Sequence, residues 1–439
     1  MERPISKAEF DRILAELDIE DVSRTAIRQC SMIGAKLEEV QGESFSHLEI
    51  GVPGIPACPV GIAAQKKALD EGVSSVYPPI QGIPELKKNA SRFVKAFIDI
   101  DIDPKGIVPT VGSMQGSMTS ILECSQLQKG KDTILYICPG FSAHGRQPDI
   151  LGINNIFFDV YEYRSEKLRE KLESYLSQGN VAAILYSNPN NPAWICMTEE
   201  ELSIIGDLAN KYDVIILEDM AYLCMDFRKD MSVPFQPPFQ STVAHYTDNY
   251  IILLSGSKIF SYAGERIGLS CISNKLYDRE YHELKEKWGI GRFGDNYILN
   301  YLYVNTSGAS HSAQYALSAM LEASVEGRYD FVKELREYAL RAHRSRQIFE
   351  DNGFHLVYDR DIEQTISDGF FYTVEYKTLG NKELLEALLR CGIIAIPLNT
   401  TGSGQSGIRV CVSRLRSEDD FDSLDRRLKM FVKLVSEKI

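Results

Sequence analysis

The sequence has no apolar run near the ~18 residues that a membrane-spanning helix needs. Its first ten residues lack the apolar core of a secretory signal. It also contains no low-complexity tract and no internal repeat. These absences favour a folded cytoplasmic protein. At 439 residues the chain is too long for one ordinary core, so we expect a large and a small domain.

The sequence is also poor in the groups that nucleic-acid and metal binding require. Basic residues number 48 against 61 acidic ones, and the net charge of −13 argues against a nucleic-acid or anionic-membrane surface. The nine cysteines are scattered and never spaced as C-x-x-C, so we expect buried free thiols in a reducing compartment. The seven histidines show no H-x-x-x-H spacing, and we expect no metal site.

Short β-branched runs alternate with amphipathic stretches between about residues 105 and 275. We expect helices at 115–128, 166–177 and 198–211, the last one opened by a capping box of Thr198 and Glu201. Near-continuous apolar strands separated by helices favour an α/β fold with a mostly parallel, seven-stranded sheet covered on both faces. The expected strands are 107–111, 133–137, 155–160, 181–186, 214–217, 250–254 and 267–272.

The two ends of the chain have a different pattern. Apolar residues recur at helical spacing in the first ~30 residues, and residues ~310–350 favour one or two long helices. Strand and helix signals then follow at 369–376, 382–391, 393–396, 408–412 and 418–438. We expect residues 70–310 to form the large domain. Residues 1–69 and 311–439, the latter beginning with the long helix, would build a smaller α+β domain.

Polar residues interrupt the chain where the expected strands end. In parallel α/β sheets, ligands bind just beyond the carboxyl ends of the strands. Arg266 opens the last strand at the same edge, so several reactive side chains should meet there. The polar segments are Gly112–Ser113–Met114, Pro139–Gly140–Phe141, Asn188–Pro192, Glu218–Tyr222 and Ser255–Lys258.

This set of side chains suits one cofactor, pyridoxal 5'-phosphate (PLP). PLP needs a lysine to form an imine and a carboxylate to keep its pyridine nitrogen protonated, and Lys258 and Asp219 can supply them. Its phosphate needs a polar nest, which Gly112 and Ser113 can form at a strand-to-helix junction. Ser255, Ser257 and Arg266 can complete the phosphate site with hydroxyls and a fork of donors.

Three segments resemble the signature of class I/II aminotransferases of PLP fold type I, which have an aspartate aminotransferase-like fold. They are Asn188–Pro192, Asp219–Tyr222 and Ser255–Arg266. The resemblance implies that Lys258 holds PLP as a Schiff base and that Asp219 pairs with the pyridine nitrogen. It further implies that Asn191 and Tyr222 bind the ring oxygen, that Phe141 stacks on the ring, and that Gly112, Ser113 and Met114 form the phosphate loop.

The same resemblance extends to residues outside the central segments. Tyr77 matches a tyrosine that reaches the phosphate in a partner subunit, which implies a homodimer with shared active sites. Arg409 matches the arginine that grips the substrate α-carboxylate. Gly51 falls where the family brings its backbone close to the substrate, and Asn191 would also lie against the substrate. The implied substrates are an amino acid and a 2-oxo acid.

The sequence departs from the family after Pro192. The family usually has Thr-Gly there, whereas this chain has Ala193–Trp194, so the local turn and the pocket wall should differ. The substrate side chain stays open. Arg292 would suit an acidic group, and Tyr297, Tyr301 and Tyr303 with Trp194 would suit an apolar or aromatic one.

The implied reaction is transamination, with Lys258 also moving the α-proton of the substrate. A lyase or decarboxylase on the same fold would share Lys258, Asp219 and the phosphate site, so it stays an alternative. From a different class, a catalytically silent PLP-binding regulator is a further alternative. Such regulators commonly carry an added DNA-binding module, and the N-terminal segment is too small for one.

Overall fold

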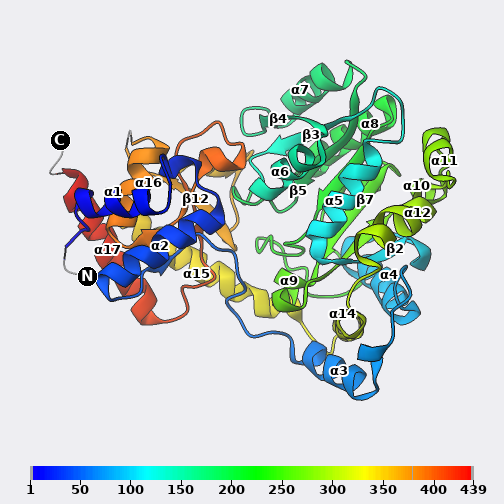
Figure 1. Ribbon diagram of the computed structural model, residues 1–439, viewed down its shortest axis with the longest axis horizontal. Helices are drawn as coiled ribbons and strands as arrows, with labels where there is room; N and C mark the ends of the chain where they lie inside the picture. The colour runs from blue at the N-terminus through cyan, green and yellow to red at the C-terminus, as the bar shows by residue number, and fades with distance from the viewer. Residues whose placement is uncertain (1–2, 378, 437–439) are drawn as a thin grey trace.

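The computed structural model describes residues 3–377 and 379–436, which form two lobes joined by the long helix α15 (Phe331–Asp351) (Figure 1). The right-hand lobe contains the large sheet, and the left-hand lobe holds the N-terminal helices together with the C-terminal segment. The expectation that both chain ends build the smaller α+β unit is therefore confirmed.

The large sheet has seven strands in the order β2-β8-β7-β6-β5-β3-β4. Six of them run in the same direction, and β8 is antiparallel to both of its neighbours. The sheet was predicted strand for strand, with shifts of one or two residues at the ends. The strands are β2 (Ile107–Val111), β3 (Thr133–Cys138), β4 (Asn154–Asp159), β5 (Val181–Ser187), β6 (Ile215–Asp219), β7 (Tyr250–Ser255) and β8 (Ile267–Ile272).

Helices cover this sheet and fill the rest of the right-hand lobe (Figure 1). Helix α8 begins with the predicted capping box: Thr198 Oγ1 accepts from the Glu201 N–H at 3.2 Å, and the Glu201 carboxylate accepts from the Thr198 N–H at 3.0 Å. The helices are α3 (Pro59–Asp70), α4 (Pro84–Ile98), α5 (Gly112–Cys124), α6 (Ser142–Leu151), α7 (Glu166–Leu176), α8 (Glu199–Tyr212), α9 (Gly256–Ile259), α10 (Asn274–Asp278), α11 (His282–Trp288), α12 (Phe293–Asn296), α13 (Tyr303–Thr306) and α14 (His311–Val325).

The left-hand lobe is built around a four-stranded antiparallel sheet, β14-β15-β12-β9. A second, parallel pair joins β1 (Ser46–His47) to β13 (Ile393–Ile394), which ties the two ends of the chain together. The other elements are α1 (Lys7–Glu16), α2 (Ile27–Gln41), β9 (His355–Leu356), β12 (Phe371–Glu375), α16 (Asn381–Arg390), β14 (Ile396–Pro397), β15 (Ile408–Cys411) and α17 (Glu418–Ser436).

Helix α14, which precedes α15 in sequence, packs against α3 and α4 in the right-hand lobe. Strand β9, which follows α15, belongs to the sheet of the left-hand lobe. The division of the chain at residues 69/70 and 310/311 stays a prediction. None of the helices in residues 3–377 and 379–436 is long and apolar enough to cross a membrane. The nine cysteines are all buried and free.

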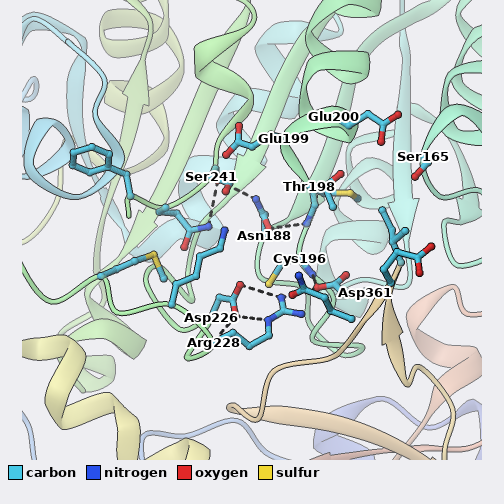
Figure 2. Close-up of a pocket in the computed structure, with 18 residues that line it drawn as sticks. Ser165, Asn188, Cys196, Thr198, Glu199, Glu200, Asp226, Arg228, Ser241 and Asp361 are labelled. Carbon is cyan, nitrogen blue, oxygen red and sulfur yellow. Dashed lines mark hydrogen bonds and ion pairs between the residues drawn. The ribbon is translucent and has the colours of Figure 1, made fainter. Parts of the chain in front are cut away.

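A hairpin of β10 (Arg360–Asp361) and β11 (Gln364–Thr365) fastens the two lobes together (Figure 2). The buried Asp361 carboxylate accepts from Arg228 Nη2 at 2.8 Å and from the Cys196 N–H at 2.9 Å. It also accepts from Arg164 Nη2 at 3.1 Å. Because Cys196 belongs to the loop that follows β5, this ion-pair cluster fixes the segment that carries Asn191.

Candidate active site

A cavity of about 610 Å³ lies beyond the carboxyl ends of the central strands. Its wall combines strand ends of the large sheet with Gly51, Phe371 and Arg409 from the segments that build the other lobe. Of the residues that the sequence nominated, twelve line this cavity. They are Gly51, Ser113, Met114, Phe141, Asn191, Asp219, Tyr222, Ser255, Ser257, Lys258, Arg266 and Arg409.

Lys258 lies in the single turn α9, directly after β7. The Ser255 hydroxyl caps this turn by accepting from the Ser257 N–H at 3.2 Å. The Lys258 Nζ donates to the Gly51 carbonyl and stands 5.2 Å from the centroid of the Phe370 ring. Burial, with the positive charges of Arg409 and Arg266 nearby, lowers the pKa of Lys258 to about 8. The amine is therefore neutral more readily than an ordinary lysine, as a nucleophile toward an aldehyde must be.

Lys87 is a second lysine whose pKa burial lowers to about 8. Its Nζ donates to the carbonyls of Gln81, Lys105 and Ile107, at 2.8, 3.4 and 2.5 Å. The side chain does not line the cavity. Lys87 is therefore a structural lysine, and its three donors are occupied by backbone.

Asp219 ends β6 with its carboxylate buried and unpaired by any cation. It accepts one hydrogen bond, from the Ala221 N–H at 3.1 Å, and burial raises its pKa to about 7. His144 Nε2 lies 3.8 Å from Asp219 Oδ2, but burial lowers the His144 pKa to about 4, which leaves the imidazole neutral. Within the described part of the chain, neither His144 ring nitrogen has a hydrogen-bond partner. A buried carboxylate of this kind fits a cationic ring nitrogen placed in the cavity.

Arg409, Asn191 and Tyr222 form a hydrogen-bonded chain in the wall of the cavity. Arg409 Nη1 donates to Asn191 Oδ1 at 3.2 Å, and Asn191 Nδ2 donates to the Tyr222 hydroxyl at 3.4 Å. The guanidinium carbon of Arg409 lies 4.5 Å from the centroid of the Phe371 ring, and Nη2 donates to the Glu49 carbonyl. Arg409 Nε is buried and has no hydrogen-bond partner among the residues that the structure describes, so the guanidinium has donor capacity left for a carboxylate.

The residues nominated for phosphate binding gather around the start of α5. Gly112 begins this helix with φ +67°, and a Cβ there would lie 2.6 Å from Arg266 Nη2, so the close approach requires glycine. Arg266 Nη1 donates to the Ser257 hydroxyl at 3.3 Å. Helix N–H groups, two serine hydroxyls and a guanidinium fit a phosphate dianion. With the unpaired Asp219 carboxylate and the Lys258 amine, they match the acceptor and donor needs of PLP.

Phe141 and Tyr77 occupy different positions relative to this cavity. The Phe141 ring lines it and packs edge-on against His144, with centroids 5.5 Å apart and planes at 83°. Tyr77 does not line it, and its side chain is 88% exposed. A role for Tyr77 at this site would therefore require a second copy of the chain.

The residues that the sequence offered for contact with the substrate side chain do not line this cavity. Arg292 pairs with Glu280 and Asp295 outside the cavity. Tyr297 is buried and bonds the Ser120 and Ser270 hydroxyls, Tyr301 accepts from the Trp288 indole, and Tyr303 is half exposed. Periodicity could not show this, because it does not record which part of the fold a segment packs against. The cavity-lining residues that sequence reasoning missed include Arg28, Arg146 and His144, the last two on α6 just after Phe141.

Trp194 keeps a glycine-like backbone, with φ +61°. The turn therefore keeps the left-handed conformation that a glycine would adopt. This conformation is unusual for so large a side chain. The indole is fully buried and packs edge-on against Tyr222, with centroids 5.3 Å apart. It supports the cavity wall from behind and does not line it.

A second cavity, of about 440 Å³, lies under the β10–β11 hairpin (Figure 2). Its buried charges are already paired: Arg228 binds both Asp226 and Asp361. Among its described lining residues, each buried carboxylate is paired with an arginine, whereas the 610 Å³ cavity holds Lys258 and the buried Asp219, so the latter is the candidate active site.

Comparison with known proteins agrees with this arrangement. The family model of aminotransferase class I and II matches residues 47–424. The chain belongs to that family. Class I and II aminotransferases of this fold use PLP, so the cofactor expected from the sequence is confirmed.

Relatives and solved structures place the aminotransferase among enzymes of several named activities. A probable aspartate aminotransferase of Methanocaldococcus jannaschii is 27% identical over 66% of this chain and 70% of its own length. An aspartate aminotransferase of Pyrococcus horikoshii is 27% identical over 56% of this chain, and the match spans 59% of that relative. An aminotransferase from Mycobacterium tuberculosis superposes with a TM-score of 0.74 at 17% identity, over 93% of this chain and 96% of that one. This last likeness confirms the fold.

Proposed function

We propose that the protein transfers an amino group between an amino acid and a 2-oxo acid, with Lys258 as the residue that bonds the PLP aldehyde. One observation carries the proposal. The buried Asp219 carboxylate and the Lys258 amine line the same cavity as Arg266, which lies against Gly112 where we expect the phosphate to bind. PLP bound there supplies an electron sink for the substrate Cα, provided that its ring nitrogen stays protonated.

Five side chains of the cavity have tasks in that reaction. Asp219 holds the proton on the ring nitrogen, and Asn191 and Tyr222 donate toward the ring oxygen. Arg409 binds the α-carboxylate through its guanidinium, which fixes the direction of the Cα–H bond. The Lys258 Nζ accepts the proton from the substrate Cα and returns it, which suits an amine with a pKa of about 8.

Borohydride reduction of the PLP-loaded protein, followed by peptide mass spectrometry, tests the assignment of Lys258. We expect the modified peptide to carry the label at Lys258, and the Lys258→Ala variant to lose both label and turnover. Lys88→Ala, a change of an exposed lysine, is the matched control. Labelling at Lys87 in the wild-type protein would overturn the assignment.

A single-turnover experiment separates this reaction from the two alternatives. An aminotransferase mixed with one amino acid stops at the pyridoxamine form until an oxo acid is added. A lyase or decarboxylase continues to turn over with the amino acid alone. A PLP-binding regulator converts nothing, although it still binds the cofactor.

We also propose a homodimer in which Tyr77 binds the phosphate in the partner subunit. The 88% exposure of Tyr77, beside the half-exposed Val76, supports this assignment. Mixing Lys258→Ala subunits with Tyr77→Ala subunits tests it. If sites are shared, the mixed dimer has one site that combines both defects and one intact site, so activity returns on mixing. If Tyr77 serves its own subunit, mixing restores nothing.

The nine buried free cysteines support a reducing, cytoplasmic location. Cell fractionation with an antibody against the protein tests that placement.

A further inference from the structure

The wall of the active-site cavity is strongly basic, although the protein is acidic overall. Five cationic side chains line it, Arg28, Arg146, Lys258, Arg266 and Arg409, against one carboxylate, that of Asp219. The whole chain has a net charge of −13. A local excess of positive charge in such a chain points to anionic ligands.

Three of the five cations have tasks in the proposed function. Lys258 bonds the cofactor, Arg266 binds its phosphate, and Arg409 binds the α-carboxylate. Arg28 and Arg146 have none. Both are exposed, and neither has an ion-pair partner among residues 3–377 and 379–436.

Arg28 and Arg146 approach the cavity from different lobes. Arg28 lies in the first turn of α2, in the left-hand lobe, and Arg146 lies on α6, in the right-hand lobe (Figure 1). On α6, Arg146 follows Ser142 by four residues, and both side chains line the cavity, as residues on one helix face should. A ligand in this cavity can therefore be contacted by arginines of both lobes.

We propose that Arg28 and Arg146 bind a second anionic group of the substrate, so that this enzyme acts on dicarboxylic amino acids and dicarboxylic 2-oxo acids. The inference rests on the proposed function of the same cavity. A guanidinium binds a carboxylate through two parallel hydrogen bonds, which neither an amide nor an alkyl side chain can replace.

The apolar residues of the wall are compatible with such a substrate. Ile27, next to Arg28 in sequence, lines the cavity together with Ile50 and Val52, and Met114 lines it from the start of α5. They can pack against the methylene groups between the two carboxylates. A wholly apolar substrate would instead bring hydrocarbon against two unpaired guanidinium groups, which is unfavourable.

The test compares matched substrates in the first half-reaction. PLP-loaded protein is mixed with L-glutamate or L-glutamine, with L-aspartate or L-asparagine, and with L-alanine and L-phenylalanine, and conversion to the pyridoxamine form is followed. We expect kcat/KM for a dicarboxylate to exceed that for its amide by roughly tenfold or more.

Arg28→Gln and Arg146→Gln should each lower kcat/KM for dicarboxylates by roughly ten- to a hundredfold, mainly through KM. The values for glutamine and alanine should stay within about twofold, because those side chains do not pair with a guanidinium. Arg92→Gln is the matched control, since Arg92 is exposed on α4 outside the cavity. The cofactor absorbance of each variant checks that the site is intact.

Two results would overturn the inference: a wild-type preference for amides or apolar amino acids, or an unchanged dicarboxylate preference in both variants. If alanine or phenylalanine is converted without any dicarboxylate preference, the substrate class fails while aminotransfer stands. If no amino acid is converted, the proposed function itself fails.

Discussion

Trp194 and Gly369 are packed so closely that residue 369 has no room for a side chain. A Cβ at residue 369 would lie 2.0 Å from Cε2 of the Trp194 indole. The same indole packs against Tyr222 and Phe371, with ring centroids 5.3 and 6.1 Å away, and both of those rings line the active-site cavity. Gly369 thus makes room for a tryptophan that supports the wall of the site.

This contact predicts a large effect of Gly369→Ala. Because the added methyl group overlaps a fully buried ring, the free energy of unfolding should fall by about 1–3 kcal/mol. Urea unfolding of the apoprotein measures it. Gly264→Ala is the control, since no atom outside its chain neighbours lies within 4 Å of its Cβ position among the described residues. In the Gly369→Ala variant, a second change, Trp194→Leu, should recover part of the lost free energy of unfolding. If the effects of the two changes on that free energy simply add, the two residues are not in contact.

Asp219→Asn should stabilise the apoprotein at pH 8 and weaken the holoenzyme. Burial raises the Asp219 pKa from 3.8 to about 7, so the folded state holds a proton that the unfolded state has released. Stability is therefore lost as the pH rises from about 4 to 7, by up to about 4 kcal/mol, and asparagine avoids that loss. Urea unfolding at pH 5 and pH 8 should show a larger gain at pH 8.

With PLP bound, the same Asp219→Asn change should reduce kcat at least about a hundredfold, because the charge that holds the ring proton is gone. Glu218→Gln offers a contrast one residue away. Glu218 is equally buried but accepts from Thr242 Oγ1 at 2.6 Å and from the Val243 N–H at 3.2 Å. Its amide variant should destabilise the protein at both pH values. Equal behaviour of the two variants would contradict the assignment of Asp219.

The apoprotein should capture PLP faster as the pH rises through about 8. Burial and two nearby arginines lower the Lys258 pKa from 10.5 to about 8, and only the neutral amine attacks an aldehyde. Stopped-flow absorbance with excess PLP gives the rate at each pH. A midpoint near 10.5 would show that the lysine is not desolvated as the structure has it.

Arg409→Lys should raise KM for every amino acid, by roughly ten- to a hundredfold, because one of the two parallel hydrogen bonds to the α-carboxylate is lost. Steady-state kinetics with alanine and glutamate measure it. Arg146→Gln provides the comparison, since it should affect glutamate alone. An effect of Arg409→Lys on glutamate but not on alanine would assign Arg409 to the side-chain carboxylate.

Asp361→Ala should lower the free energy of unfolding by about 1–3 kcal/mol, because it removes a buried carboxylate that Arg164, Arg228 and the Cys196 N–H share. Thermal unfolding measures the change. Glu363→Gln, in the exposed turn of the same hairpin, is the control and should shift stability by less than about 0.5 kcal/mol. If both variants lose a similar free energy of unfolding, the ion pairs of Asp361 are not what stabilises the hairpin.

Much of the fold followed from local sequence patterns. Seven apolar runs became the seven strands of the large sheet, and Thr198 with Glu201 began α8 as expected. Periodicity worked here because buried parallel strands and amphipathic helices each have a strong local pattern. It did not reveal that β8 runs antiparallel to β2 and β7, because strand direction depends on the path of the chain.

The sequence by itself determined the family and the cofactor, because the Asn191, Asp219 and Lys258 segments are each short and lie at strand ends that one sheet edge must bring together. Only the tertiary structure decided what surrounds them. Arg292 and Tyr297 looked like selectivity residues but face away, whereas Arg28 and Arg146 line the cavity from different lobes. Arg28 and Arg146 are 118 positions apart in the sequence. They line one cavity because their helices belong to lobes that pack together, and a local sequence pattern cannot predict that packing.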